Sequence, residues 1–565
     1  MNASEERAPA GGERRALILL LLLSLGLNAW AIDWGLPSPS GWAPDELLPS
    51  AVLDGMSRGF GGGWHSRYPP LHYYLLAVLY APVLMAEGVR AGAPVPPEVY
   101  HRLFLLGRGL SLLMAAGALL LVYRCGRELG DARAGLFAAA ATGLMAPFVF
   151  YAKLANLEMP CLFWWVFSLL LLLKVLGRHR RRDYVWLAVT AVLAVTTKDQ
   201  AYGLYVLAVP LVVWSRFHHD RRARGSATPA GALLNADTLL AGAVAAVLFL
   251  IIHNVAGNAA GFRAHLVMIT GRASQDFREF SNDVGGHAAL LASTIRQVLF
   301  TLGLPAFLLG GLGLVDAVRR RETRWLTLVV PAVSFYLCFL SVVLYVYDRF
   351  VLPLAVVGAL LAGRWLSARG HARGWMRATA RGAAAVTIAY GLASALGLDL
   401  SMMNDARYAA EDWLRANAGT GLVGAIGPPE YLPRLDGLNA RPIGPAVARI
   451  EKLRPDHVVV NADYAARADD GSEERALYAE LADGTLGYRE AWRHRYRAPW
   501  PLLDTAALVE RTGREPLRTN LGKVNPEVVV YRRSPPEPKI SWHVRRIPPY
   551  LVVSGSPDGP QNLLY

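Results

Sequence analysis

The chain has 565 residues, of which 53% are hydrophobic and 18% charged, and its mean hydropathy is +0.28. Many long apolar runs separated by arginine clusters are typical of a polytopic membrane protein. The formal net charge of +14 does not indicate a nucleic-acid partner, because the arginines lie in short loops between apolar runs, where basic residues set topology. The three cysteines match no metal or redox spacing and imply no disulfide scaffold.

The chain begins with a polar tail, residues 1–15, that ends in two arginines, and an uncharged run over residues 16–32 follows. The positive-inside rule places this tail in the cytoplasm. Since no small-residue cleavage site precedes Asp33, we expect an uncleaved first span rather than a signal peptide. The following loop, residues 33–102, then lies outside the cytoplasm, in the periplasm if the cell is a Gram-negative bacterium.

Asp45 and Glu46 stand together in this external loop, close to the membrane surface. Carboxylates beside hydrocarbon lose hydration, and we expect this loss to raise their pKa values from about 4 toward the range of a useful base. The plain alternative is that Pro44 and the two acids open a surface helix, because proline and acidic residues suit a first helical turn.

Residues 71–85 are apolar, but this run is shorter than the roughly 20 residues that a straight spanning helix needs. We therefore expect an element that lies in the membrane plane or re-enters the membrane. With this assignment every strongly basic loop falls on the cytoplasmic side, whereas a full span here would put them all outside, against the positive-inside rule. These loops are residues 124–133, 174–182, 216–224, 319–324 and 364–381.

The sequence thus predicts an α-helical membrane domain over residues 16–400, with about 11 transmembrane helices and an external C-terminus. The spans are expected at residues 16–32, 103–123, 134–151, 159–173, 184–197, 201–214, 233–252, 302–318, 325–345, 351–366 and 383–398.

From about residue 401 acids, prolines and turn residues appear and long apolar runs stop. Residues 401–565 therefore predict an external α/β domain of roughly 165 residues, enough for a core of its own. The domain has no Walker-type phosphate loop and no Rossmann glycine fingerprint, so a nucleotide site is unsupported. Strands are expected at residues 421–426, 457–460 and 526–531, and helices at residues 405–416 and 473–482.

Polar residues collect at the external ends of the predicted helices. Two or three carboxylates and three cations at one face can hold an acid/base pair against a phosphate or phosphoester. Besides Asp45 and Glu46, the members are Lys153, Asn156, Glu158, Lys198, Asp199, Asp348 and Arg349.

These residues also have plain structural interpretations. Lys198 fits a lysine that extends from a helix end to the membrane interface, and Glu158 fits the cap of the helix that follows it. Asp348 and Arg349 fit a structural ion pair at the membrane surface. His65 and His72 suit interfacial side chains better than metal ligands, because no helical histidine or carboxylate spacing accompanies them.

Five motifs follow one another along the chain and share the external side. They are the Asp45-Glu46 pair, Tyr68-Pro-Pro-Leu before the in-plane element, Asn156-Leu-Glu158-Met-Pro160 before a helix, a Thr-Lys helix end at Lys198, and Arg349-Phe-x-x-Pro353. In this order they resemble the GT-C glycosyltransferases, especially bacterial relatives of protein O-mannosyltransferases (family 39) and of the lipid A aminoarabinose transferase. The resemblance covers residues 1–366 in layout, and the C-terminal domain is similar to the external domain common in that group.

The resemblance implies an inverting transfer of a sugar from a polyprenyl-phosphate carrier to an envelope acceptor at the external face of the bilayer. By position, Asp45 is expected to be the general base, with Glu46 holding the acceptor or the base. Lys198 and Arg349 are expected to bind the carrier phosphate. Glu158 stands where these families often have aspartate, so its catalytic role in orienting the acceptor or contacting a metal stays open, as does a divalent metal cofactor.

The remaining expected substrate-binding residues flank these motifs: Asp199, Asp348, Tyr68 and His72. The carrier's polyprenyl tail is expected to lie in lipid between helices.

Two other classes of protein remain. A transporter or flippase also carries charges near helix ends, but transporters usually show repeated halves and ionisable groups near mid-membrane, whereas here the charges gather at one face and no internal repeat is found. A scaffold protein that binds a partner through the external domain is compatible with the sequence but leaves the charged cluster unexplained. The sequence names neither the sugar nor the acceptor.

Overall fold

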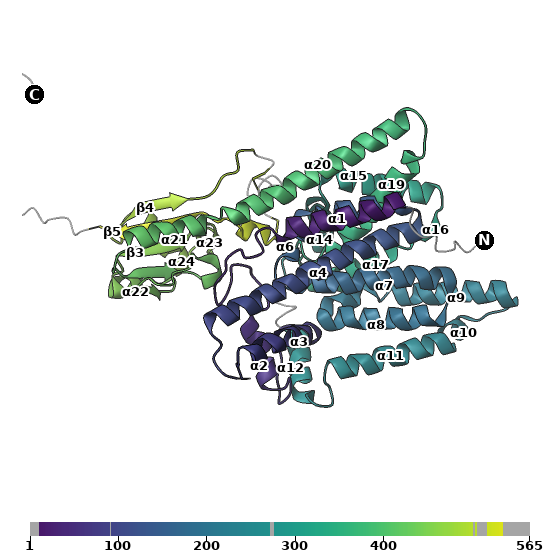
Figure 1. Cartoon of the computed structure of the whole chain (residues 1–565), viewed down its shortest axis with the longest axis horizontal. Helices are drawn as coiled ribbons and strands as arrows, with labels where there is room; N and C mark the ends of the chain where they lie inside the picture. Colours follow the sequence, from purple (N-terminus) through teal and green to yellow (C-terminus); the bar gives the residue numbers. More distant parts are fainter. Residues whose placement is uncertain (1–10, 91, 272–275, 501–502, 505–516, 535–565) are drawn as a thin grey trace, which may run out of the picture.

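The computed structural model describes residues 11–90, 92–271, 276–500, 503–504 and 517–534. Long helices lie side by side in a bundle, and a small sheet with short helices stands at one end of it (Figure 1). The elements of the bundle are α1 (Gly11–Ala29), α4 (Pro97–Leu129), α5 (Ala132–Gly143), α6 (Ala146–Ala152), α7 (Glu158–Arg178), α8 (Arg181–Thr197), η1 (Asp199–Leu204), α9 (Ala208–Arg224), α10 (Pro229–Leu233), α11 (Ala236–Ile252), α14 (Val284–Leu302), α15 (Leu304–Arg319), α16 (Thr323–Leu326), α17 (Val329–Phe335), η2 (Tyr336–Leu340), α18 (Ser341–Val343), α19 (Leu352–Gly370) and α20 (Trp375–Met403).

Four helical segments in the described part of the chain are long and apolar enough to cross a membrane, and two bent pairs raise this number to six. The chain is therefore a membrane protein. The larger expected number of spans stays a prediction, because helix length and composition alone select these segments and leave shorter apolar helices such as α11 aside. The four segments are Pro97–Leu129, Glu158–Arg178, Thr323–Val343 and Trp375–Asn417.

The bundle departs from the predicted elements at three points. The run expected to span over residues 201–214 is divided between η1 and α9. The run expected to form one helix over residues 134–151 is broken into α5 and α6, which meet at 71°. Pro147 opens the second of these helices, and a proline cannot donate the backbone hydrogen bond that would continue the first. In addition, α14 was not predicted, and it precedes α15 at a bend of 115° beside Gly303, whose φ is 78°.

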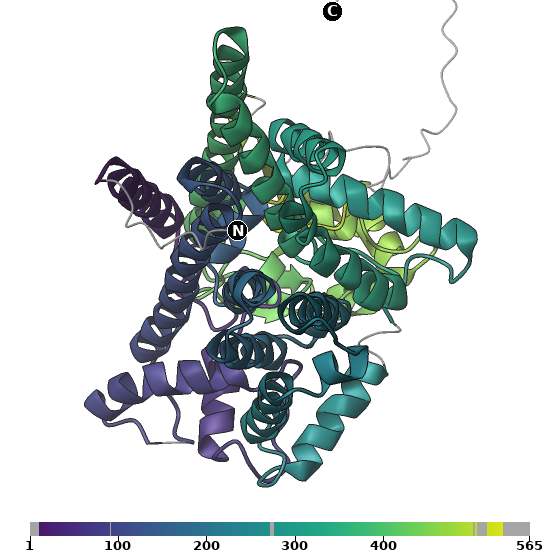
Figure 2. The ribbon, with the colours of Figure 1, turned by 90° about the vertical axis from the view of Figure 1, so that its right-hand side faces the viewer.

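Residues expected to lie in the membrane plane form α3 (Leu71–Ala86), close to the predicted bounds. Figure 2 looks along the long helices and shows α3 and the preceding α2 (Pro49–Ser57) lying across the bundle rather than along it. Helix α3 packs against α4 and α8, and α12 (Ala259–Thr270) follows α11 on the same side. Helices α2 and α3 both belong to the loop of residues 33–102.

The sheet belongs to the C-terminal part of the chain. Its described strands run in the order β2-β1-β3-β5-β4, with β1 parallel to β2 and β3, and β5 antiparallel to β3 and β4. The predicted strands at residues 421–426, 457–460 and 526–531 and both predicted helices are confirmed. The elements are β1 (Val423–Ile426), β2 (Ala440–Pro442), β3 (His457–Asn461), β4 (Tyr488–His494), β5 (Val528–Arg533), α21 (Ala406–Asn417), α22 (Val447–Leu453), α23 (Ala462–Ala465), α24 (Glu473–Ala482), η3 (Pro429–Tyr431) and η4 (Leu521–Lys523).

The sequence missed β2 and β4 because both lie at sheet edges and are largely exposed, so neither carries an apolar run. Each face of the sheet has its own apolar layer. Leu414 of α21 packs on one face, and Leu477 of α24 packs on the other. The sheet is thus covered on both sides by its own helices.

The loop that leads to Asp45 is held against the C-terminal part by a cluster of aromatic rings and arginines. Trp34 Nε1 donates to Asp405 Oδ2 at 3.1 Å, and the Arg407 guanidinium lies 4.2 Å from the ring centroid of Trp42. Gly35 has a φ of 74°, and a Cβ there would lie 2.7 Å from Trp42 Cγ, so glycine is required. Its N–H donates to Tyr408 Oη at 3.0 Å.

Candidate active site

Asp45 lies in the loop between α1 and α2 with a φ of 61°, a left-handed conformation uncommon for a residue with a side chain. One carboxylate oxygen accepts a hydrogen bond from Arg67 Nη1 at 2.7 Å, and the other accepts one from Arg349 Nη1. The side chain of Asp45 is 19% exposed. It is therefore an accessible carboxylate that two arginines from distant segments hold in place.

The pKa of Asp45 does not follow the sequence-based expectation. Burial raises it, but the charges of Arg349 and Arg67 outweigh burial and lower the pKa to about 2. The expected rise was therefore wrong for this carboxyl, because the sequence does not show that two guanidinium groups pair with it. Asp45 is ionised at neutral pH in this arrangement.

Glu46 makes a different set of contacts. Arg108 Nε and Nη2 donate to its two carboxylate oxygens at 2.7 and 2.9 Å, and both side chains are fully buried. The backbone N–H of Ala155 donates to the same carboxylate at 2.8 Å. No part of the Glu46 side chain reaches solvent, and its contacts tie the Asp45 loop to α4; its expected role in holding the acceptor or the base stays a prediction.

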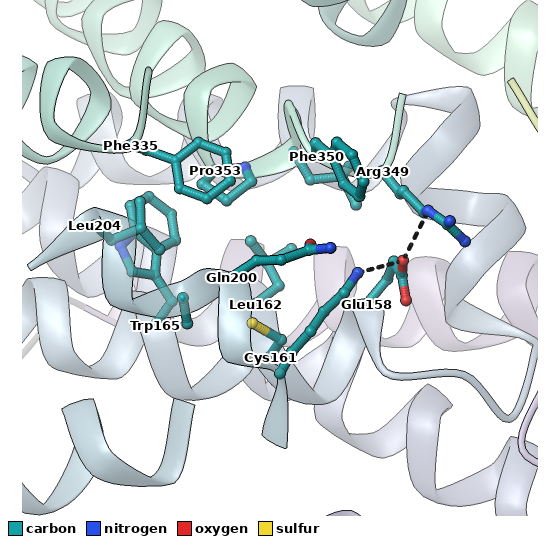
Figure 3. A pocket seen from close by; sticks show the side chains of 13 residues that line it. Glu158, Cys161, Leu162, Trp165, Gln200, Leu204, Phe335, Arg349, Phe350 and Pro353 are labelled. Atoms are coloured by element: carbon teal, nitrogen blue, oxygen red, sulfur yellow. Dashed lines mark hydrogen bonds and ion pairs between the residues drawn. The ribbon is translucent and has the colours of Figure 1, made fainter. Parts of the chain in front are cut away.

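Glu158 begins α7 and lies between two cations. Lys198 Nζ, at the end of α8, donates to Glu158 Oε1 at 2.6 Å, and Arg349 Nε lies 3.7 Å from the same oxygen (Figure 3). Arg349 Nε is buried and has no hydrogen-bond acceptor within the described residues. The ring of Phe350 lies beside both cations, with its centroid 5.6 Å from Lys198 Nζ. Because Arg349 Nε is buried without an acceptor in the described part of the chain, this donor can still bind an anionic oxygen.

A small pocket, with a cavity volume of about 30 Å³, begins at these charges. Glu158 and Arg349 stand at one end of it, and Trp165, Leu204 and Phe335 line the other end (Figure 3). Cys161 and Gln200 lie between the two ends, so the lining changes from charged to apolar along the pocket.

A larger groove, with a cavity volume of about 600 Å³, shares Trp165 and Leu204 with this pocket. Residues of α7, α8, α9 and α11 line it, and they are almost all apolar. The shared residues make the two spaces neighbours. An anionic group bound at the charged end would therefore have an apolar groove beside it for an attached lipid tail.

Asp348 does not line the pocket. It is fully buried and accepts hydrogen bonds from Tyr151 Oη at 2.9 Å and from Thr519 Oγ1 at 2.6 Å. Burial raises the pKa of Asp348. Asp348 thus joins α6 to the C-terminal segment behind Arg349, and its expected contact with the substrate stays a prediction.

Asp199 also lies outside the pocket lining and pairs with a residue that the sequence analysis missed. His265 Nε2, on α12, lies 3.2 Å from Asp199 Oδ2, and the other ring nitrogen lies 3.0 Å from the Ser66 carbonyl oxygen. Burial opposes the charged form of His265, but the hydrogen bond and charge of Asp199 together raise its pKa. Asp199 thus helps to hold the segment that carries Arg67.

Tyr68 lies near Asp45, and burial together with the Asp45 charge raises the pKa of its hydroxyl. His72 is fully buried in α3, and neither ring nitrogen has a hydrogen-bond partner among the described residues. Lys153 is buried as well, where it pairs with Asp399 and donates to the Trp30 carbonyl at 3.0 Å. The structure therefore brings Tyr68 to the site and leaves His72 and Lys153 in structural positions.

Four basic residues near the site were not among the sequence candidates. Arg108 carried a usable signal, because a lone arginine inside an apolar run needs a buried partner. Arg67, His265 and Lys523 carried none, since each lies in a polar or mixed segment whose position depends on the fold. Within the described parts of the chain, no group of three or more histidine, cysteine or acidic side chains is arranged to hold a metal ion.

Comparisons with known proteins add one sequence match. Residues 105–234 match the family model described as dolichyl-phosphate-mannose-protein mannosyltransferase. This match confirms the resemblance to GT-C glycosyltransferases. It covers α4 to α10, including Glu158 and Lys198, and leaves Asp45 and Arg349 outside. No curated protein matches the chain.

Three solved structures are similar over different shares of the chain. The archaeal oligosaccharyltransferase AglB from Archaeoglobus fulgidus, in complex with an inhibitory peptide and a dolichol-phosphate, is 14% identical, with a TM-score of 0.44, over 93% of this chain and 89% of its own. ArnT from Cupriavidus metallidurans, bound to undecaprenyl phosphate, is 14% identical, with a TM-score of 0.45, over 91% and 97%. The Pmt1-Pmt2 complex of S. cerevisiae, bound to the sugar donor, is 16% identical, with a TM-score of 0.35, over 49% and 36%.

Proposed function

We propose that this protein is a membrane glycosyltransferase that moves a sugar from a polyprenyl-phosphate-linked donor to an envelope acceptor, with inversion, at the external face of the bilayer. The observation that carries the proposal is the pocket in which the Lys198 ammonium and a buried Arg349 Nε, without a hydrogen-bond acceptor among the described residues, stand at the head of an apolar groove. Cations at one end and apolar walls at the other suit a lipid phosphate. The family match of residues 105–234 supports the same class of reaction.

In this proposal the carrier phosphate binds Lys198 and Arg349 and replaces part of their pairing with Glu158 and Asp45. The polyprenyl tail follows the apolar groove between α7, α8, α9 and α11. Glu158 holds the two cations in position while the phosphate is absent, because it contacts Lys198 and lies 3.7 Å from Arg349. The two cations stabilise the phosphate as it leaves the sugar.

Asp45 accepts the proton from the acceptor hydroxyl as the new bond from the acceptor oxygen to the sugar C1 forms. The bond from C1 to the carrier phosphate oxygen breaks at the same time, and its electron pair stays on the phosphate. A carboxylate paired with two arginines is a weak base, but a phosphate that draws Arg349 away removes part of this pairing. Donor binding therefore raises the basicity of Asp45 at the moment when it is needed.

The same proposal keeps the division of the chain at residues 15 and 400. Residues 1–15 are a cytoplasmic tail, residues 16–400 form the membrane domain with the site in the loop of residues 33–102, and residues 401–565 form the external domain. The protein then lies in the inner or plasma membrane with Asp45 outside the cytoplasm.

The test uses the purified full chain in lipid nanodiscs with a radiolabelled carrier-linked sugar and extracted envelope acceptors. Asp45→Asn is expected to lower transfer by about 10²–10⁴-fold, the usual contribution of a general base, while binding the carrier as well as the wild type does. Lys198→Met and Arg349→Met are expected to weaken carrier binding. Asp54→Asn is the matched control, since Asp54 is a carboxylate on α2 that pairs with Arg58 in solvent.

Carrier binding can be followed independently through Cys161, which lines the pocket between its charged and apolar ends. With the other two cysteines replaced by serine, undecaprenyl phosphate is expected to protect Cys161 from a small thiol reagent. Near wild-type transfer by Asp45→Asn would refute the role of this carboxylate. Unprotected Cys161 at saturating carrier would refute the lipid site.

A further inference from the structure

The C-terminal part of the chain reaches into the candidate site through a short segment, residues 517–525. Thr519 of this segment donates to the buried Asp348, and Asn520 Nδ2 donates to Tyr151 Oη at 3.2 Å. The backbone N–H of Asp348 donates to the Arg518 carbonyl at 3.2 Å. These contacts place the segment directly behind Arg349, the residue that follows Asp348.

Lys523 ends the helical turn η4 within this segment. Its ammonium has no hydrogen-bond or ion-pair partner in the portion of the chain that the structure describes, and its one ring contact is with Tyr431, whose centroid lies 5.6 Å away. The charged side chains that act on it come from three segments: Asp45, the adjacent Asp348 and Arg349, and Arg467. The ammonium therefore feels the charge of the proposed base but makes no ion pair with it, and Asp45 pairs instead with two arginines.

Positive charge exceeds negative charge around Asp45. Arg67, Arg349 and Lys523 all act on this one carboxylate, and Arg467 adds a further cation beside Lys523. Burial and the nearby cations lower the pKa of Lys523 to about 8, although the Asp45 charge opposes this shift. Gathering cations in a partly buried place is unfavourable unless an anion joins them.

We propose that Lys523 is a phosphate-binding residue of the active site, so that the C-terminal domain supplies one wall of the anion site and Arg349 supplies the other. The inference rests on the proposed function and deepens it, because it assigns the external domain a direct contact with a substrate phosphate. The ligand chemistry is a phosphate monoester or diester. Its source is either the lipid carrier or a phosphate group on the acceptor, and the experiment separates the two.

The competing explanation is a tether in which Lys523 only holds the segment against the ring of Tyr431. The two explanations differ in their substitutions. A tether is lost in both Lys523→Gln and Tyr431→Leu, and the unfolding temperature falls in both. A phosphate-binding residue is lost in Lys523→Gln alone, with the unfolding temperature unchanged, and Lys523→Arg restores binding. Lys452→Gln is the control, since Lys452 is an exposed lysine on α22 of the same domain.

The experiment measures the affinity of the full chain in nanodiscs for undecaprenyl phosphate, by protection of Cys161, together with transfer kinetics. We expect Lys523→Gln to weaken carrier binding at least 10-fold at pH 7. In the wild type the affinity is expected to fall as the pH rises through about 8, where the lysine loses its proton. Lys523→Arg is expected to bind the carrier without this fall, because a guanidinium keeps its charge at that pH.

The acceptor arm compares a phosphorylated acceptor with its dephosphorylated form. Unchanged carrier binding with a raised KM for the phosphorylated acceptor alone supports the proposal and assigns the phosphate to the acceptor. Wild-type carrier binding and wild-type KM for both acceptors in Lys523→Gln would overturn it, and so would equal losses in Lys523→Gln and Tyr431→Leu. Carrier binding is measured without turnover, so it decides the role of Lys523 even where Asp45→Asn has refuted the transfer reaction.

Discussion

Replacing Glu46 with glutamine removes the charge that neutralises a fully buried arginine. Arg108 stays in place, because its Nη1 still donates to the carbonyl oxygens of Ile32 and Trp34 at 2.7 and 2.9 Å. The guanidinium then lacks a counter-charge, and the amide group of the glutamine presents a donor where a second acceptor stood. Removing one partner of a buried ion pair costs about 3–5 kcal/mol.

This cost is expected to lower the thermal unfolding temperature of the protein in nanodiscs by roughly 5–10 °C, given about 2 °C per kcal/mol for a long chain. Transfer is expected to fall as well, because the Asp45 loop loses its anchor to α4. The matched control is Glu87→Gln, which breaks a surface pair with Arg102; this arginine lies on α4, the helix that also carries Arg108. A surface pair contributes about 0–1 kcal/mol, so this variant is expected to unfold almost like the wild type.

A second variant tests the reasoning from the other side. Glu46→Leu combined with Arg108→Met replaces the whole pair by apolar groups, and it is expected to recover much of the stability lost in Glu46→Gln. Equal unfolding temperatures for Glu46→Gln and Glu87→Gln would refute the argument, since they would show that the buried guanidinium needs no counter-charge.

Three further outcomes follow from the contacts. His265 has a raised pKa in the folded state, so its pairing with Asp199 stabilises the protein fully below the unfolded pKa of about 6.5. This stabilisation is lost as the pH rises through the folded pKa. The unfolding temperature of the wild type should therefore fall between pH 6 and 9, and that of His265→Gln should fall much less. Trp42→Ala should destabilise the docking of the C-terminal part by about 3–5 kcal/mol and speed its release by limited proteolysis. An unchanged rate of cleavage would show that the ring of Trp42 does not hold this part in place. Gly61→Cys and Ser472→Cys should react with an impermeant thiol reagent on whole cells while Arg222→Cys is protected, and the reverse pattern would invert the topology.

The sequence by itself determined the class of this protein and the type of most of its elements. Apolar runs must leave water and arginines mark the loops between them, so composition alone shows a membrane protein. The strands at residues 421–426 and 457–460 and the helix at residues 473–482 were also readable, because each buries a continuous or periodic apolar run. The edge strands were not, since an exposed strand needs no such run.

Only the tertiary structure decided how the charges pair. Asp45 and Glu46 are neighbours in the chain, yet their environments differ. Asp45 is accessible and pairs with Arg349, which lies 304 residues away, whereas Glu46 is fully buried and pairs with Arg108. Asp348 and Arg349 are likewise adjacent, but the aspartate is buried against Thr519 and the arginine lines the pocket. Pairing depends on distances between side chains from remote segments, and these distances exist only once the loop, the bundle and the sheet have packed together.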